Sequence, residues 1–154
     1  MNGMRRGLTL IEIIIAVALI AILVGLGFLA LNPVGQLAAA RNSQRSFHLN
    51  GLMNGIRQNL ADMNNGSFDC DSGGALPTST AKKMATGVGN YDIASCLVPI
   101  YLPNMPFDPS AAGAHYASNS DYDTGYTIVR NATTGQVTLN APAAELNKVI
   151  SVTR

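Results

Sequence analysis

One long run of almost entirely apolar residues near the start of the chain constrains its structure more than any other feature. Between Leu8 and Leu31 only Thr9 and Glu12 carry polar side chains. A helix over these residues is about 36 Å long, which is enough to cross a hydrocarbon layer of about 30 Å. The run therefore predicts one membrane-spanning helix, in which Glu12 needs an explanation because a buried, unpaired carboxylate is costly.

The residues around the run leave two ordinary explanations open. A secretory signal peptide would share the basic start and the small residues LAAA at 37–40, but the run is too long for one and contains an acid. A plain membrane anchor accounts for the length but not for Glu12, which would cost about 2.5–3.5 kcal/mol at mid-membrane. In a membrane anchor Arg5 and Arg6 stay in the cytoplasm, so the rest of the chain is exported.

The stretch RRGLTLIE, residues 5–12, supplies a third explanation that accounts for each of these features. It resembles the processing site of type IV prepilins and of the related pseudopilins. The resemblance implies that a prepilin peptidase removes residues 1–7 as a leader by cutting after Gly7, and then methylates the new N-terminus at Leu8. Glu12 is then the acid near the start of the mature chain that takes part in filament assembly.

In a processed subunit of this kind, Glu12 has a chemical role. Cleavage creates an α-amine inside an apolar environment, and the carboxylate of a neighbouring subunit can neutralise it. Within one chain the two groups are about a turn apart on a rigid helix, so pairing between subunits is the more useful geometry. The chain departs from the family in having Leu8 where Phe is most common, and in placing Pro33 at the end of the apolar segment. Residues 8–33 are expected to span the membrane and later to form the filament core.

The sequence after the apolar run predicts a second, amphipathic helix over residues 34–63. Its apolar residues recur at helical spacing and form one stripe, while Arg41 and Arg45 are expected on other faces of the helix. His48 is expected on the exposed side as a solvated residue. The triplet NNG at 64–66 is expected to end the helix. The stripe is expected to pack on a sheet and consists of Leu49, Leu52, Met53, Ile56, Leu60 and Met63.

Residues 64–100 are rich in Gly, Ser, Asn and Thr and are expected to form a loop. Cys70 and Cys96 are the two cysteines of the chain, and in an exported domain they predict one disulfide, with two free thiols as the alternative. Such a bond would stabilise the domain by roughly 3–4 kcal/mol. Asp92 is expected to cap a short helix that runs through Cys96 and Leu97.

The remaining residues, 101–154, are predicted to form an antiparallel β region. Three prolines between Tyr101 and Pro109 exclude a regular helix or a central strand there. A meander of three or four strands is expected, with strands at 124–131, 135–141 and 148–153. The predicted fold class is therefore α+β and pilin-like. A long N-terminal helix, apolar in its first half and amphipathic in its second, packs on a small C-terminal sheet within an extracytoplasmic head of residues 34–154.

A catalytic constellation is missing from the sequence. Charged residues are only 12% of the chain and the net charge is +1, which gives no support to a nucleic-acid binder. His48 and His115 lie far apart without a metal-ligand spacing, and no glycine-rich loop follows a predicted strand. We therefore expect a protein that is not an enzyme and needs no cofactor.

Three polar features are weaker candidates for a role. Asp121 and Asp123 lie in a polar loop, where their oxygens could bind calcium as in a comparable loop of the major pseudopilins of type II secretion, or could belong to a plain Asp-rich turn. Asn131 begins an Asn-Ala-Thr triplet that matches a glycosylation acceptor. Three tyrosines are expected either to contact neighbouring subunits or to pack the sheet, namely Tyr116, Tyr122 and Tyr126.

Together these features predict a structural subunit of a type IV pilus-like filament that serves adhesion, motility or DNA uptake. The resemblance implies as partners other copies of the chain, a prepilin peptidase, an inner-membrane platform protein and an assembly ATPase. The subunit would wait in the inner membrane with a single span and a cytoplasmic N-terminus, and then form a filament at the cell surface or in the periplasm. A pseudopilin of a type II secretion system is the alternative within the family, and an unprocessed membrane-tethered binding domain is the alternative outside it.

Overall fold

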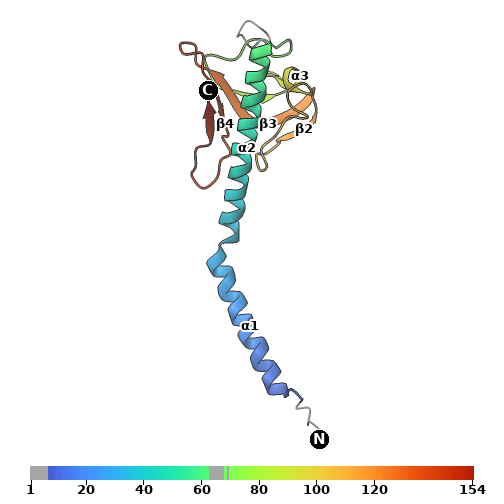
Figure 1. The fold of residues 1–154 in the computed structure, drawn as a ribbon, viewed down its shortest axis with the longest axis vertical. Helices are drawn as coiled ribbons and strands as arrows, with labels where there is room; N and C mark the ends of the chain where they lie inside the picture. The colour runs from blue at the N-terminus through green and yellow to red at the C-terminus, as the bar shows by residue number, and fades with distance from the viewer. Residues whose placement is uncertain (1–6, 63–67, 69) are drawn as a thin grey trace. The chain divides into compact units, whose positions relative to one another are not determined.

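The structure is a computed structural model that describes residues 7–62, 68 and 70–154 (Figure 1). The basic residues of the expected leader and the expected helix end at 64–66 lie outside the described residues. The elements run in the order α1, α2, β1, α3, β2, β3, β4, β5. The chain is thus helical in its first part and forms a sheet in its second.

The chain divides into two compact units, Met1–Leu37 and Ala38–Arg154. Sequence analysis placed the corresponding boundary at Pro33, before the second helix. The first turn of that helix, with the exposed side chains of Val34 and Leu37, belongs to the first unit, and the boundary at Pro33 stays a prediction.

The first helix, α1 (Leu10–Leu31), begins at a polar cap. Thr9 is the N-cap residue, with extended backbone at φ −81° and ψ 152°, and its hydroxyl accepts a hydrogen bond of 3.3 Å from the backbone N–H of Glu12. The segment Leu10–Gly27 has a mean hydropathy of 2.9, and 0% of it is buried. By length and composition α1 is able to cross a membrane, as the apolar run predicted.

The dipeptide Asn32-Pro33 ends this helix and begins the next, α2 (Pro33–Asp62). Asn32 has a left-handed backbone at φ 38°, a conformation that asparagine adopts more readily than most residues. Its side-chain oxygen accepts a hydrogen bond of 3.3 Å from the N–H of Gly35. Pro33 suits the first helical position because it has no N–H to leave unpaired.

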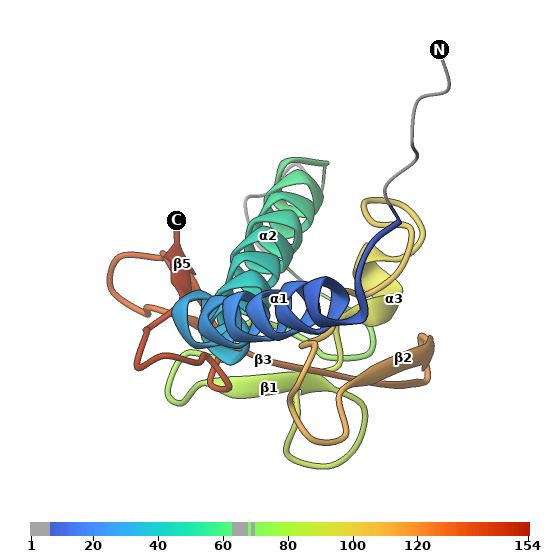
Figure 2. The same ribbon diagram turned by 90° about the horizontal axis from the view of Figure 1, so that it is seen from below.

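In the second unit α2 buries the apolar stripe expected from the sequence. Leu49, Leu52, Met53 and Ile56 are fully buried, Leu60 is partly buried, and Met63 lies outside the described residues. The stripe joins one core with sheet residues that include Tyr126, Ile128 and Leu139. The helix lies across one face of the sheet (Figure 2), so the predicted packing of helix on sheet is confirmed.

The sheet has five antiparallel strands in the order β1-β3-β4-β5, with β2 also paired to β3. Its strands are β1 (Lys82–Ala85), β2 (His115–Ser118), β3 (Asp121–Arg130), β4 (Val137–Asn140) and β5 (Ser151–Thr153). Along β3 buried residues alternate with less buried ones, which places one face of the central strand on the core. A long N-terminal helical part followed by a small antiparallel sheet is the expected α+β, pilin-like layout.

The strands differ from the prediction in their number and bounds. β3 begins earlier than expected, and β4 and β5 are shorter than the runs that predicted them. β1 lies inside residues 64–100, so the expectation of a loop is wrong there, and β2 was not predicted at all. The sequence of β1, KKMA, is rich in residues that are uncommon in strands, and its pairing with β3 makes it one.

Ion pairs fix two later segments of the chain to α2. Arg45 is fully buried, and its guanidinium donates to the carboxylates of Asp108, at 2.8 and 3.0 Å, and Glu145, at 2.9 Å. Arg41 also pairs with Glu145, at 2.6 Å. The sequence placed Arg45 only on a face other than the apolar stripe, and it is buried because the fold brings two distant acids to that face.

Candidate functional site

The expected cleavage site lies in non-helical chain just before α1. Gly7 and Leu8 precede the first helical residue, Leu10, and both are exposed. A Cβ atom built on Gly7 would meet no atom within 4 Å, so no neighbouring part of the described chain crowds this position. Proteolysis favours exposed segments of this kind over packed structure. The geometry therefore suits cleavage after Gly7 and modification of an accessible Leu8.

Glu12 lies in the first turn of α1. It stands three residues after Thr9, and the hydroxyl of Thr9 binds its N–H in the manner of a capping box. The positive end of the helix dipole favours a carboxylate at this position. The acid thus lies at the same end of the helix as the amine that cleavage would create. Sequence reasoning missed the cap, although Thr followed by Glu three residues later, before an apolar run, is its usual signal.

The rest of α1 offers an apolar surface that no described residue covers. Leu, Ile and Val side chains between Leu10 and Leu26 are more than half exposed, and Glu12 is the one charged residue of the helix. A contiguous apolar surface of this size marks a contact with a membrane or with other protein. The helix is therefore built to be covered by lipid or by other apolar helices.

In the head, the disulfide between Cys70 and Cys96 is formed, with Cα atoms 5.8 Å apart. It ties the segment that follows α2 to the short helix α3 (Ala94–Leu97). Asn59 of α2 donates a hydrogen bond of 3.3 Å to the carbonyl of Cys96, so α3 is also held to the long helix. The bond expected from the two cysteines is thus present, and it closes the segment that contains β1.

The expectation that Asp92 caps α3 is wrong. The N-cap residue is Ile93, whose side chain makes no capping hydrogen bond. The hydroxyl of Tyr122, from β3, accepts hydrogen bonds from the N–H groups of Ile93 (2.8 Å) and Ala94 (3.2 Å), and donates one to Asp92 (2.9 Å). Burial raises the pKa of Tyr122, so the hydroxyl keeps its proton. Tyr122, from a distant strand, therefore caps the start of α3, the role that the local sequence predicted for Asp92.

A second buried tyrosine corrects the prediction for His48. Tyr126 is fully buried, and its hydroxyl oxygen lies 2.9 Å from Nδ1 of His48 on α2. Burial lowers the pKa of His48, so the ring is neutral at neutral pH. The expectation of a solvated His48 is wrong, and both Tyr122 and Tyr126 pack the core, while Tyr116 is half-buried.

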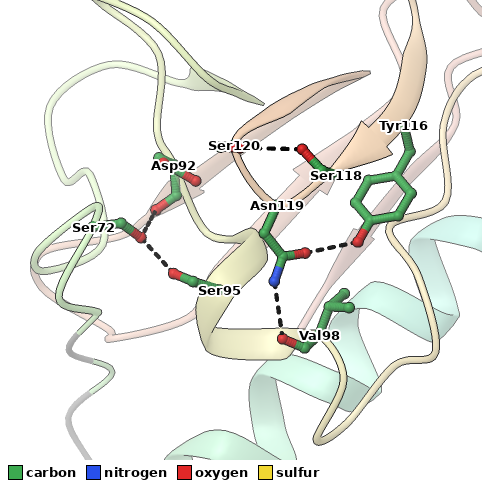
Figure 3. Close-up of a pocket in the computed structure, with 8 residues that line it drawn as sticks. All are labelled: Ser72, Asp92, Ser95, Val98, Tyr116, Ser118, Asn119 and Ser120. Atoms are coloured by element: carbon green, nitrogen blue, oxygen red, sulfur yellow. Dashed lines mark hydrogen bonds between the residues drawn. The ribbon is translucent and has the colours of Figure 1, made fainter.

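An open hollow of about 590 Å³ lies between the disulfide loop, α3 and the β2–β3 hairpin (Figure 3). Its hydroxyl groups bind one another, since Ser72 and Ser95 lie 2.8 Å apart and Ser118 and Ser120 lie 3.1 Å apart. Asp92 is the one charged residue among those that line it. Activation of a serine needs an adjacent base, and the lining residues place no histidine or lysine beside these hydroxyls.

Asp121 and Asp123, the candidate calcium ligands, lie in β3 and have partners of their own. Asp123 pairs with Lys83 of β1 and accepts a hydrogen bond of 2.8 Å from the N–H of Gly125. Oδ1 of Asp121 lies 3.0 Å from Nε2 of His115. Among the described residues, no group of three or more His, Cys, Asp or Glu side chains is arranged to hold a metal ion. Both oxygens of Asp123 accept hydrogen bonds in this structure, and calcium binding by Asp121 and Asp123 stays a prediction.

Asn131, the candidate glycosylation acceptor, lies in the exposed turn between β3 and β4. Its side-chain oxygen accepts hydrogen bonds from the N–H groups of Thr133, at 2.8 Å, and Thr134, at 3.0 Å. This is the Asx turn by which asparagine closes many hairpins. Asn131 therefore has a structural role in the hairpin, and its glycosylation stays a prediction.

Comparison with known proteins identifies one region of the chain. Residues 2–28 match the family model of the prokaryotic N-terminal methylation motif, the signature of type IV pilins and pseudopilins. No curated protein and no solved structure matches the chain. The match spans Gly7, Leu8, Glu12 and most of α1, and it confirms the resemblance of RRGLTLIE to a prepilin processing site. The motif indicates a structural subunit rather than an enzyme, and with the apolar helix it fits an anchor in the inner membrane before assembly.

Proposed function

We propose that this protein is a structural subunit of a type IV pilus-like filament, cleaved after Gly7, methylated at Leu8 and assembled through α1. One observation carries the proposal: the methylation motif at residues 2–28 runs into a helix whose apolar surface is exposed on every side. A simple anchor would need the apolar surface, but it would need neither the motif nor Glu12. Filaments of this kind serve adhesion, motility or DNA uptake.

Before assembly the subunit waits in the inner membrane, where lipid covers α1. Moving an apolar helix from lipid into a bundle of similar helices gains little hydrophobic free energy, because lipid tails are as apolar as its side chains. Extraction therefore needs work, which an assembly ATPase supplies through an inner-membrane platform protein. Once the filament is in water, each helix hides apolar surface at about 25 cal/mol per Å², so the assembled state persists.

Glu12 determines where each incoming subunit is placed in the filament. Its carboxylate and the methylated amine on Leu8 of a neighbouring copy carry opposite charges, and a pair of charges interacts far more strongly in an apolar bundle than in water. A charge left unpaired in that bundle would be costly. An incoming subunit is therefore stable only where its carboxylate and an amine meet. Thr9 supports this by fixing the first turn of the helix that carries Glu12.

The head would form the coat of the filament outside the cytoplasm. Its disulfide, its buried Arg45 pairs and its helix-on-sheet core hold it together. A polymer that bears load needs such a head, because a subunit that unfolds would expose the helices beneath it.

The test is the mass of the N-terminal peptide, measured in sheared surface material and in membranes of the same cells. A peptide that begins at Leu8, heavier by one methyl group and abundant in the sheared fraction, supports a processed filament subunit. A peptide that begins at Met1 in both fractions contradicts the proposal and leaves a membrane-tethered domain.

A pseudopilin of a type II secretion system is the second candidate, because the same motif marks pilins and pseudopilins. It would form a short periplasmic filament. The processed, methylated peptide would then be confined to the cell envelope and missing from the sheared fraction.

A further inference from the structure

The open hollow of Figure 3 is assembled from three segments that lie far apart in the sequence. Ser72 lies in the disulfide loop, a second group of lining residues lies at 92–98 around α3, and a third lies at 116–120 in the β2–β3 hairpin. Figure 3 shows Ser72 and Asp92 on one side of the hollow and Tyr116 on the other. Only the fold brings these residues together, so no pattern in the sequence pointed to them.

Hydrogen bonds between the segments hold the hollow in shape. The side chain of Asn119 donates to the carbonyl of Val98, at 3.2 Å, and accepts from the hydroxyl of Tyr116, at 2.7 Å. The hydroxyls of Ser72 and Ser95 lie 2.8 Å apart and join the disulfide loop to α3. A ligand that enters such a preformed hollow does not have to order its walls first, which favours binding.

The polar atoms that stay open in the hollow are mostly hydrogen-bond acceptors. A hydroxyl has one proton and two lone pairs, so the serines that bind one another keep unused lone pairs. One carboxylate oxygen of Asp92 accepts from the hydroxyl of Tyr122, at 2.9 Å, while the other accepts no hydrogen bond from the described residues. No lysine or arginine is among the residues that line the hollow. The hollow therefore suits a ligand that donates several hydrogen bonds and carries no negative charge.

Tyr116 gives the same hollow an apolar wall. Its ring is half-buried, with its centre 6.4 Å from that of the Tyr122 ring, and Val98 is the other large apolar residue of the lining. A sugar ring carries C–H groups on its faces and hydroxyls at its edge, so it matches an aromatic wall beside polar acceptors. The volume of about 590 Å³ exceeds the about 150 Å³ that holds benzene, which leaves room for a six-membered sugar ring with its hydroxyls.

We propose that this hollow binds the ring of a neutral sugar, with Tyr116 against a face of the ring and the open oxygen of Asp92 accepting from its hydroxyls. Other ligands fit the lining less well. An anion would meet Asp92 with no cation beside it, and a single carboxylate open to water stabilises a cation only weakly. The inference goes beyond the proposed function and does not depend on it, because the hollow lies within one head.

One site of this kind binds weakly. An open hollow leaves part of the sugar in water, and each hydrogen bond to the protein replaces one to water. We expect a dissociation constant on the order of 1 mM. Copies arrayed in a filament would bind a surface that carries many such sugars more tightly, because each further contact is made at high effective concentration.

Nuclear magnetic resonance of the full chain tests the site, in micelles of a detergent that has no sugar headgroup. The probes are glucose, galactose and mannose, each compared with its uronic acid, in which the C6 alcohol is replaced by a carboxylate. We expect saturable shifts of the backbone amide signals of Ser95, Tyr116 and Asn119 with at least one neutral sugar, and binding of the matching acid that is at least tenfold weaker. No shift with any neutral sugar, shifts confined to other parts of the head, or tighter binding of the acid would overturn the proposal.

The methyl glycoside of the bound sugar identifies the source of the ring. Its anomeric oxygen is already linked, as in a glycan, whereas that of the free sugar is not. Both results support the site: binding of the methyl glycoside points to a ring at the end of a sugar chain, and its exclusion points to a free sugar.

Substitutions test the two residues that define the site. Asp92→Asn keeps an oxygen that accepts from Tyr122 but replaces the open carboxylate oxygen with a donor, and it should weaken binding about tenfold or more, the scale of losing a hydrogen bond to a charged group. Tyr116→Leu removes the aromatic wall and should also weaken binding. Asp71→Asn is the matched control, since Asp71 is exposed in the same disulfide loop and does not line the hollow, and it should bind as the wild type does.

Amide signals far from the hollow show whether each variant is folded. Wild-type binding by folded Asp92→Asn and Tyr116→Leu would overturn the proposal. Because these measurements use single chains in micelles, their failure leaves the filament function untouched. A chain that is never processed or assembled would contradict the filament function and leave sugar binding as it stands.

Discussion

Arg45 of α2 and Asp108, which precedes β2, bind each other through two hydrogen bonds of 2.8 and 3.0 Å, and neither side chain is exposed. The paired geometry is the strong form of an arginine–carboxylate contact. The backbone N–H groups of Ser110 and Ala111 also donate to Asp108, each at 2.9 Å. The pair thus joins the long helix to the proline-rich segment that precedes β2.

Removing the arginine should destabilise the head strongly. Arg45→Met leaves the carboxylate of Asp108 buried without its cation, and breaking one side of a buried pair typically costs about 3–5 kcal/mol. The measurement is urea unfolding of the full chain in detergent micelles, followed by the near-ultraviolet signal of its tyrosines. Arg57→Met, at an exposed position of the same helix, is the control and should change little. Equal stability of the two variants would contradict the role given to the pair.

Acid should weaken the same cluster. Hydrogen bonds from Arg41 and Arg45 lower the pKa of Glu145 from 4.5 to about 2. Since the folded-state pKa lies below the unfolded one, the stabilisation is present above pH 4.5 and is lost as the pH falls toward 2. The urea midpoint should therefore fall across this window, and Glu145→Gln should flatten the fall. If the urea midpoint of Glu145→Gln falls with pH as steeply as that of the wild type, the loss of stability in acid comes from groups other than Glu145.

The disulfide should contribute roughly 3–4 kcal/mol to the stability of the head, as expected for a loop of this length. The change is Cys70→Ser together with Cys96→Ser, and the measurement is again the urea midpoint in micelles. Reductant should lower the midpoint of the wild type by a similar amount and leave the double variant unaffected. A reductant effect that persists in the double variant would show that the bond is not its cause.

The cap at Thr9 should govern the first turn of α1. Thr9→Val keeps the shape of the side chain but removes the hydroxyl that accepts from the N–H of Glu12, and loss of an N-cap costs about 0.5–2 kcal/mol. Hydrogen exchange at the amide of Glu12 in micelles should become faster in this variant, while Thr9→Ser should restore the wild-type rate. Unchanged exchange in Thr9→Val would mean that the hydroxyl does not hold this turn.

Replacing the acid in α1 separates the filament proposal from a simple anchor. Glu12→Leu makes the helix more apolar, so insertion into the membrane should persist, but the charge that meets a neighbouring amine is lost. We expect slowed or absent filament assembly, measured as subunit in the sheared fraction. Glu12→Gln, which keeps the shape without the charge, should show the same defect. Normal assembly in both variants would favour the unprocessed, tethered domain.

The sequence predicted the helices and three of the strands well, but it misplaced residues whose surroundings come from elsewhere in the chain. β1 was expected to be loop because Lys82 and Lys83 lower its strand propensity, and only its pairing with β3 overrides that preference. His48 was expected in solvent, and Arg45 on a face other than the apolar stripe, because a helical pattern places polar residues away from the buried face. Tyr126 and Asp108 cover those positions in the fold.

By itself, the sequence determined the features that depend on neighbours a few positions apart: the apolar length of α1, the methylation motif ahead of it, the helix break at Asn32–Pro33 and the buried stripe of α2. Helical periodicity and caps act over one or two turns, so these features can be read without the fold. Only the tertiary structure decided that Tyr122 caps α3, that Arg45 is buried against Asp108, and that Tyr126 meets His48. The cost or gain of burying a polar or aromatic group depends on the partners that meet it, and the fold brings those partners from distant parts of the chain.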